Sequence, residues 1–141
     1  MDKELMIKEL RRDEGVVSHA YQDHLGYWTI GVGRLIDKRR GGKLRKSEID
    51  MLLSNDIDEF AASLDKHLPW WRTLDGVRQR VILNMAFNLG VNGLLGFKNT
   101  LAYVKAGNYE KAASNMLLSK WARQVGNRAK RLSEMMRTGK A

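Results

Sequence analysis

Residues 14–35, EGVVSHAYQDHLGYWTIGVGRL, decide the fold class of this chain. Residues 16–35 are rich in β-branched and aromatic side chains, which favour strands over helices. The DHLG stretch at 23–26 is typical of a turn, and Gly31 and Gly33 relax the strand that follows it. We therefore predict a small hairpin or three-stranded sheet here, between two regions of helical pattern.

Helical periodicity is present on both sides of this stretch. Before it, Met6, Ile7 and Leu10 share one face of a helix that ends near Gly15. After a basic loop at 37–46, apolar residues recur at intervals of three and four as far as Pro69. This pattern predicts one long amphipathic helix over residues 47–68.

The start of that helix and the rest of the chain are predicted from local signals. Ser47 and Asp50 have the spacing of a capping box. A second strong helix carries apolar residues from 74 to 89, and Gly90 is expected to end it. Shorter helices are expected at 94–105, 109–118 and 128–137, with breaks at Gly107 and Gly126.

The predicted fold class is α+β and mostly helical. The 141 residues suffice for one compact domain, so we expect a single unit over 1–141. Its expected parts are a β-containing lobe with a cleft at 14–46, a connecting helix at 47–68 and a helical lobe at 69–141. The helix at 2–13 is expected to pack on the helical lobe.

Composition limits the function further. The chain has 25 Lys and Arg against 16 Asp and Glu, a net charge of +9, which favours a polyanionic partner such as nucleic acid, anionic lipid or a wall polymer. With no cysteine, disulfides, thiolate zinc sites and a cysteine nucleophile are excluded. No apolar run reaches the roughly 18 to 20 residues of a membrane span, and the N-terminus lacks a signal-peptide pattern. We expect a soluble protein made in the cytoplasm that needs separate release to act outside it.

Two carboxylates and a hydroxyl form the candidate catalytic group. Glu14 is near a helix end, Asp23 is in the predicted turn and Thr29 is in the following strand. Glycoside hydrolysis requires one carboxyl that donates a proton and one that is ionised, and a threonine hydroxyl could hold the attacking water. A glutamate at a helix end is commonly solvated, an aspartate in a turn commonly bonds to its own backbone, and a threonine in a strand commonly only packs. The pattern alone therefore leaves a catalytic and a structural interpretation open.

The surrounding motifs resemble one known family. They are DEG at 13–15, YQD at 21–23, GYWTIGVG at 26–33 and NMAFNLG at 84–90, with further similarity at GF 96–97, Trp121, NRAKR 127–131 and RTG 137–139. Together they resemble the phage-type lysozymes, glycoside hydrolase family 24, over nearly the whole chain. The resemblance implies a muramidase that cuts the β-1,4 bond between N-acetylmuramic acid and N-acetylglucosamine in bacterial peptidoglycan.

The resemblance also assigns residue roles. It places Glu14 on the general acid, Asp23 on the second catalytic carboxylate and Thr29 beside the attacked sugar carbon, and it favours inversion. Substrate contacts fall on Leu35, Phe87, Thr100 and Asn115. Arg128 falls on an arginine close to the catalytic glutamate, where a cation would favour the ionised carboxylate although a general acid needs its proton.

The chain departs from the best-known relative at two positions. Arg34 replaces a histidine that pairs with an aspartate on the long helix, and Asp56 occupies that helical position, so we expect Arg34 and Asp56 to form the replacement pair. Asn88 replaces a glutamine, a change expected to affect the cleft wall.

Other interpretations remain open at this stage. A lytic transglycosylase would cut the same bond with a single acid, and a basic helical protein would bind nucleic acid, although no aromatic stacking array accompanies the basic residues. The basic segment 128–137, with Leu132, Met135 and Met136 on one side, is a candidate for binding an anionic outer-membrane surface, although a solvated helical face is the commoner outcome. Trp70 and Trp71 could form a platform that stacks on sugars, but such aromatic pairs more often belong to the core, and we expect them there.

No cofactor is expected. The three histidines lack the spacing of metal ligands. The expected partner is peptidoglycan, bound by a monomer without specific nucleic-acid recognition.

Overall fold

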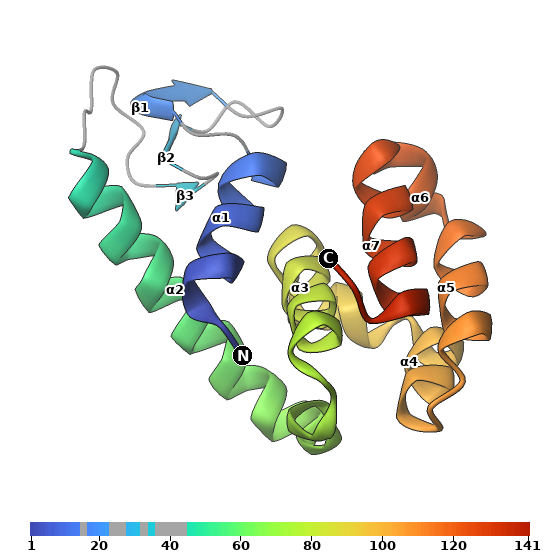
Figure 1. The fold of residues 1–141 in the computed structure, drawn as a ribbon. Coiled ribbons are helices and arrows are strands. Elements are labelled where there is room, and N and C mark those ends of the chain that lie inside the picture. Colours follow the sequence, from blue (N-terminus) through green and yellow to red (C-terminus); the bar gives the residue numbers. More distant parts are fainter. Residues whose placement is uncertain (15–16, 23–27, 32–33, 36–44) are drawn as a thin grey trace. The chain divides into compact units, whose positions relative to one another are not determined.

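The computed structural model describes residues 1–14, 17–22, 28–31, 34–35 and 45–141, with the backbone alone given for 17–22, 28–31 and 34–35 (Figure 1). The chain divides into two compact units. One comprises Asp2–Asp58, and the other comprises Glu59–Ala141 together with Met1. The class is mostly helical, as the sequence predicts.

The first unit contains α1 (Lys3–Glu14), three short strands and the beginning of α2 (Lys46–His67). The strands β1 (Val17–Gln22), β2 (Trp28–Gly31) and β3 (Arg34–Leu35) pair antiparallel in the order β1-β2-β3. They lie within the stretch whose composition favours strands. Thr29 is opposite Tyr21 on one side and Leu35 on the other, so the strand that carries Thr29 is central.

The long helix α2 begins one residue earlier than predicted, and the predicted capping box is wrong. The backbone N–H of Arg45 donates to Oε1 of Glu48 at 3.3 Å, so Glu48 fills the third helical position and bonds back to the cap. Asp50 instead accepts from Nη1 of Arg11 at 3.3 Å, which joins α1 to α2. The prediction that the helix ends before Pro69 is confirmed, since α2 ends at His67.

The second unit is helical in all of its regular elements. It contains the end of α2, the 3-10 helix η1 (Pro69–Thr73), α3 (Gly76–Leu95), α4 (Lys98–Lys105), α5 (Tyr109–Leu117), α6 (Lys120–Val125) and α7 (Asn127–Thr138). Its fully buried side chains include Trp71, Ile82, Leu83, Met85, Leu94, Met116 and Leu132. Each such side chain contributes about 1.5–3 kcal/mol by leaving water. The prediction of a core position is confirmed for Trp71, whereas Trp70 is only half-buried.

Two helix boundaries in this unit differ from the predictions. The predicted break at Gly90 is confirmed, since its φ of 76° and ψ of 158° are non-helical and only glycine adopts them readily, but a further helical segment follows it to Leu95. The helix expected at 94–105 therefore begins only at Lys98. The short helix α6 was not predicted, although Ser119 caps it by accepting from the N–H of Ala122.

The basic C-terminal helix α7 presents charge to solvent and buries its apolar side. Leu132 and Met136 are 0% exposed and Met135 is 7% exposed, whereas Lys130 and Arg137 are exposed. Within the described residues no single helix is long and apolar enough to cross a membrane. The sharply bent pair α3 and α4 reaches that length and apolar composition only when the two helices are taken together.

Candidate active site

The three candidate catalytic residues are described to different extents. Glu14 is the last residue of α1, and its side chain is partly exposed. Thr29 lies in the central strand β2 and Leu35 in β3, both with backbone positions only. Asp23 lies outside the described residues. The convergence of Glu14, Asp23 and Thr29 on one groove therefore stays a prediction.

The residue before Glu14 helps to orient the end of α1. The side chain of Asp13 is fully buried, and its Oδ1 lies 3.4 Å from Nε of Arg12. Successive helical residues point about 100° apart, so burial of Asp13 fixes the direction in which Glu14 leaves the helix. No role for Asp13 was predicted from the sequence. The available signal was an acid directly beside the candidate catalytic one.

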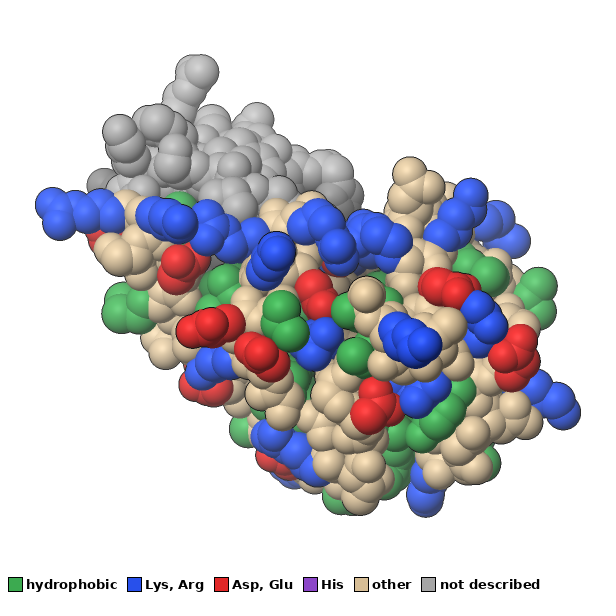
Figure 2. All heavy atoms as spheres, in the orientation of Figure 1, with side chains coloured by type: hydrophobic (Ala, Val, Ile, Leu, Met, Phe, Trp, Pro, Cys, Tyr) green, Lys and Arg blue, Asp and Glu red, His purple; other side chains and the backbone are tan. Residues whose placement is uncertain are grey.

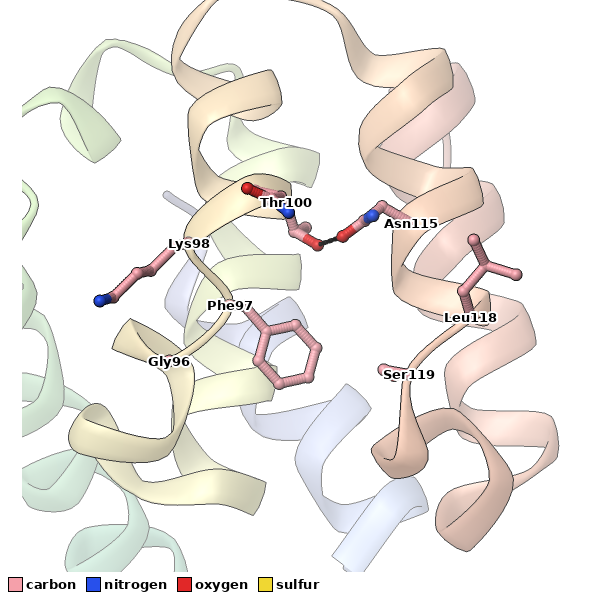
Figure 3. A pocket seen from close by; sticks show the side chains of 8 residues that line it. Gly96, Phe97, Lys98, Thr100, Asn115, Leu118 and Ser119 are labelled. Atoms are coloured by element: carbon pink, nitrogen blue, oxygen red, sulfur yellow. Dashed lines mark hydrogen bonds between the residues drawn. The ribbon is translucent and has the colours of Figure 1, made fainter.

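A pocket of about 510 Å³ lies in the helical unit, within the size range of small-ligand sites. It is lined by Gly96, Phe97, Lys98, Asn99, Thr100, Asn115, Leu118 and Ser119. At its wall the hydroxyl of Thr100 donates to Oδ1 of Asn115 at 2.5 Å (Figure 3). The structure thus brings together two of the predicted substrate contacts, from α4 and α5.

The chemistry of this pocket suits binding rather than bond cleavage. Its described lining offers amide and hydroxyl groups, one lysine and the apolar surfaces of Phe97 and Leu118, but no acid and no histidine. Thr100 is only 1% exposed, so its hydroxyl needs a partner, and Asn115 supplies one. The hydrogen bond occupies the Asn115 oxygen and leaves the amide nitrogen to donate to a ligand.

A buried tryptophan supports the pocket from behind. The indole N–H of Trp121 in α6 donates to Oδ1 of Asn88 in α3 at 2.5 Å. The Trp121 ring meets the Phe97 ring edge to face, with centroids 6.0 Å apart and planes at 82°. Asn88 therefore acts on the pocket through Trp121 and Phe97. Asn88 was expected to affect the cleft wall, but its hydrogen bond with Trp121 was not predicted.

Phe87 is not among the residues that line the pocket. Its ring stacks on that of Phe60 in α2, with centroids 4.6 Å apart and an interplanar angle of 29°. Both side chains remain partly exposed. Phe87 therefore joins α3 to the end of α2, and its predicted contact with substrate stays a prediction.

Arg128 is 8% exposed and is held from α3. Its Nε and Nη2 both donate to Oδ1 of Asn84, at 3.0 and 2.8 Å, and Asn84 is fully buried. The side chain is therefore no solvated surface arginine. Its predicted proximity to Glu14 stays a prediction, as does the pair between Arg34 and Asp56, because the Arg34 side chain is outside the described part of the chain.

The comparisons with known proteins agree with one another. The profile of the family described as "Phage lysozyme" matches residues 11–138. The chain is 30% identical to "Probable T4-type lysozyme 1" of Dictyostelium discoideum, with 92% of each protein covered. It is 30% identical to "Endolysin" of Bacillus phage B103, over 85% of this chain and 45% of that protein.

A third relative is much longer than this chain. The "Pre-baseplate central spike protein Gp5" of Enterobacteria phage T4 is 31% identical over 95% of this chain, which covers 28% of that protein. All eight candidate site residues lie within the matched range 11–138.

Proposed function

The chain belongs to the phage lysozyme family of glycoside hydrolases, and from this premise we propose that it is an endolysin that hydrolyses the β-1,4 bond between N-acetylmuramic acid and N-acetylglucosamine in peptidoglycan. The observation that carries the proposal is the family match over 11–138, which includes the acid pair and its glycine-rich context. Two relatives carry the name endolysin, and that name supports a role in lysis.

The proposed mechanism divides the chemistry between two carboxyl groups. Glu14 donates its proton to the bridging oxygen as the glycosidic bond breaks, and Asp23 acts on the opposite face of the sugar ring. Thr29 holds the water that attacks the sugar carbon, and Asp23 takes its proton. The position of Glu14 at the end of α1 and of Thr29 on the central strand supports this division, because both are fixed by regular structure.

The same mechanism has an alternative form that stereochemistry distinguishes. If the two carboxyl groups are about 6.5 to 9.5 Å apart, water fits between Asp23 and the sugar and the configuration inverts. At about 5 to 5.5 Å, Asp23 would attack directly and the configuration would be retained. We propose inversion, which gives Thr29 a role in holding water. NMR of the anomeric proton in the first product tests this stereochemistry.

Substrate binding is proposed for the pocket between α4 and α5. The Thr100 to Asn115 hydrogen bond fixes an amide that can donate to an acetamido or hydroxyl oxygen of the glycan. Leu35 and Phe87 are proposed as further contacts. Arg128 is proposed to lie near Glu14 when substrate is bound, where exclusion of water by the glycan offsets the preference of a nearby cation for the ionised acid.

The proposed site of action is the cell wall, reached after separate release from the cytoplasm in which the enzyme is made. The proposal includes an interaction of α7 with an anionic outer membrane, and the burial of Leu132, Met135 and Met136 limits α7 to its charged face. Deleting residues 130–141 would remove these core side chains, so charge-neutralising substitutions are the sounder test.

Product analysis tests the reaction class. Purified peptidoglycan is digested with the chain, and the fragments are analysed by mass spectrometry. Hydrolysis predicts reducing ends on muramic acid, with one water added for each bond cut. Anhydro ends, which lack that water, would identify a lytic transglycosylase and overturn the proposal. Undigested walls with a folded protein would overturn it as well.

A further inference from the structure

The net positive charge of this chain is confined to one of its two units. Residues 59–141 carry 14 Lys and Arg but only five Asp and Glu, whereas residues 1–58 carry 11 of each. The helical unit therefore holds the entire formal charge of +9. Charge of one sign concentrated in one unit creates a local field that attracts polyanions.

Within the helical unit, an acid-free segment carries much of this charge. Residues 111–133 contain six Lys and Arg and no Asp or Glu. Lys120 and Arg123 are exposed and share one side of α6, being three positions apart, and Lys130 is exposed near the start of α7. Figure 2 shows Lys and Arg side chains on the surface at the upper right, where α6 lies in Figure 1. We call Lys120, Arg123 and Lys130 the α6–α7 basic patch.

The basic patch differs from the paired cations of the same unit. Arg72 is bonded to Asp65, Arg78 to Asp75 and Arg137 to Glu134. For the patch residues, the described part of the chain contains no ion pair. Their charges are therefore available to a ligand, and binding would release counterions without first breaking an internal bond.

We propose that the α6–α7 basic patch binds a wall-attached polymer of repeating phosphodiester units and so holds the enzyme on its substrate. The proposal rests on the proposed function, which brings the chain to the cell wall. A regular phosphodiester polymer has the closely spaced charges for which several separate cations, together, give a strong and salt-dependent interaction. None of the three patch residues lines the pocket between α4 and α5. Binding of the polymer by the patch would therefore add to recognition of the glycan and not replace it.

Two other polyanions fit the same surface less well. Binding at a lipid surface needs an apolar helix face to enter the bilayer, and the apolar side of α7 is buried. Leu117 and Leu118 are exposed beside α6, but two leucines do not make such a face. Single-stranded nucleic acid is held by aromatic side chains that stack on bases, and Trp121 in α6 is only 4% exposed.

The test compares two triple variants of equal charge in a co-sedimentation assay. The patch variant is Lys120→Gln, Arg123→Gln and Lys130→Gln, and the control is Lys66→Gln, Lys105→Gln and Lys140→Gln. All six positions are exposed and lie in the helical unit. Both variants also carry Glu14→Gln, so that walls persist during the measurement. The probes are walls bearing phosphodiester polymer and the same walls stripped of it with hydrofluoric acid.

The patch variant is expected to bind intact walls at least about tenfold more weakly than its parent at about 50 mM salt, and the control at most about threefold more weakly. The slope of log K against the logarithm of the salt concentration should become shallower by about two to three units in the patch variant, near one unit for each lost phosphate contact. Removal of the polymer should weaken wall binding by the parent to the level that the patch variant shows on intact walls. The proposal would be overturned if both triple variants lost the same wall affinity. It would also be overturned if the parent bound stripped walls as tightly as intact ones.

Two further measurements separate the alternatives. Stronger binding to anionic vesicles or to single-stranded DNA than to intact walls would overturn the choice of partner. In the background that keeps Glu14, the patch variant should cut a soluble, uncharged glycan fragment at the parental rate. A cleavage rate that fell in proportion to the wall affinity would assign the patch to catalysis instead. If the parent cuts no glycan but still binds walls through the patch, the proposed function fails and this inference stands.

Discussion

The hydroxyl of Thr100 donates a 2.5 Å hydrogen bond to Oδ1 of Asn115 and joins α4 to α5 at the wall of the pocket. Because Thr100 is buried and Asn115 is partly exposed, the bond sets the direction of an amide that a ligand can reach. The amide held in this way is the group that we propose as a glycan contact.

Thr100→Val tests the role of that hydrogen bond. Valine fills the same buried volume, and water can replace the hydroxyl at Asn115, so the free energy of unfolding should change by no more than about 1 kcal/mol. If the amide binds glycan, KM for soluble glycan fragments should rise several-fold. Unaltered kinetics in a stable variant would exclude this pocket from substrate binding.

Asn84→Ala tests the support of Arg128. The substitution removes the acceptor of two hydrogen bonds from a guanidinium that is 8% exposed. A buried charged group left short of partners costs roughly 2–3 kcal/mol, so the urea midpoint should fall clearly. Lys105→Ala, at an exposed position of the same unit, should stay within about 0.5 kcal/mol. Similar small losses for both variants would show that Asn84 does not hold Arg128.

Asp65 gives the fold a defined dependence on pH. Hydrogen bonds from Arg72, at 2.7 and 3.1 Å, and from the indole of Trp71, at 2.8 Å, lower the pKa of Asp65 below its ordinary value of 3.8. A lowered folded-state pKa means that the stabilisation is complete above 3.8 and is lost as pH falls through the folded value.

Asp65→Asn keeps an oxygen for Trp71 but removes the charge. Because the carboxylate is 45% exposed, the loss at pH 7 should be only about 0.5–1 kcal/mol, and it should shrink as the pH is lowered towards about 2. Asp65→Ala also removes the acceptor of a buried indole N–H and should cost about 1–2 kcal/mol more. Urea unfolding across this pH range checks both. A loss for Asp65→Asn that is independent of pH would contradict the assignment.

The C-terminal end of α7 is fixed by Arg78. Its Nε and Nη2 donate to the carbonyls of Met136 and Arg137, and its guanidinium lies 3.6 Å from the centre of the Tyr109 ring. Gly139 has φ 70°, and a Cβ there would lie 2.9 Å from Nη1 of Arg78. The guanidinium cannot retreat without losing these contacts.

Gly139→Ala should therefore destabilise the fold more than Gly107→Ala does. Gly107 has φ 79° but open space around its Cβ position, so alanine there costs only the left-handed strain of about 1–2 kcal/mol. The added clash at Gly139 should raise the loss by at least about 1 kcal/mol in urea unfolding. Equal losses would mean that Arg78 moves freely.

Local patterns predicted the helices better than their junctions. The end of α2 before Pro69 and the positive φ of Gly107 and Gly126 follow from single residues whose backbone preferences are strong. The helical segment between Gly90 and Leu95 was not predicted because it has too few residues to show periodicity. The short helix α6 has too few residues to show periodicity.

For the site, the sequence predicted residues but not their partners. Thr100 and Asn115 were assigned through family resemblance, and the structure shows that they bond to each other. Asn84 and Arg128 are 44 positions apart, and Asn88 and Trp121 are 33 apart. Pairs at such separations depend on how helices pack, which no local pattern contains.

The proposed mechanism requires Glu14 as the proton donor, and the decisive test is the clearance of purified walls by Glu14→Gln. Glutamine preserves the shape of the side chain but cannot donate a proton to the bridging oxygen. The rate should fall by at least about a hundredfold, while Glu4→Gln, at an exposed position in the first turn of the same helix, should clear walls at the parental rate. Clearance by a folded Glu14→Gln variant at the rate of Glu4→Gln would contradict the account.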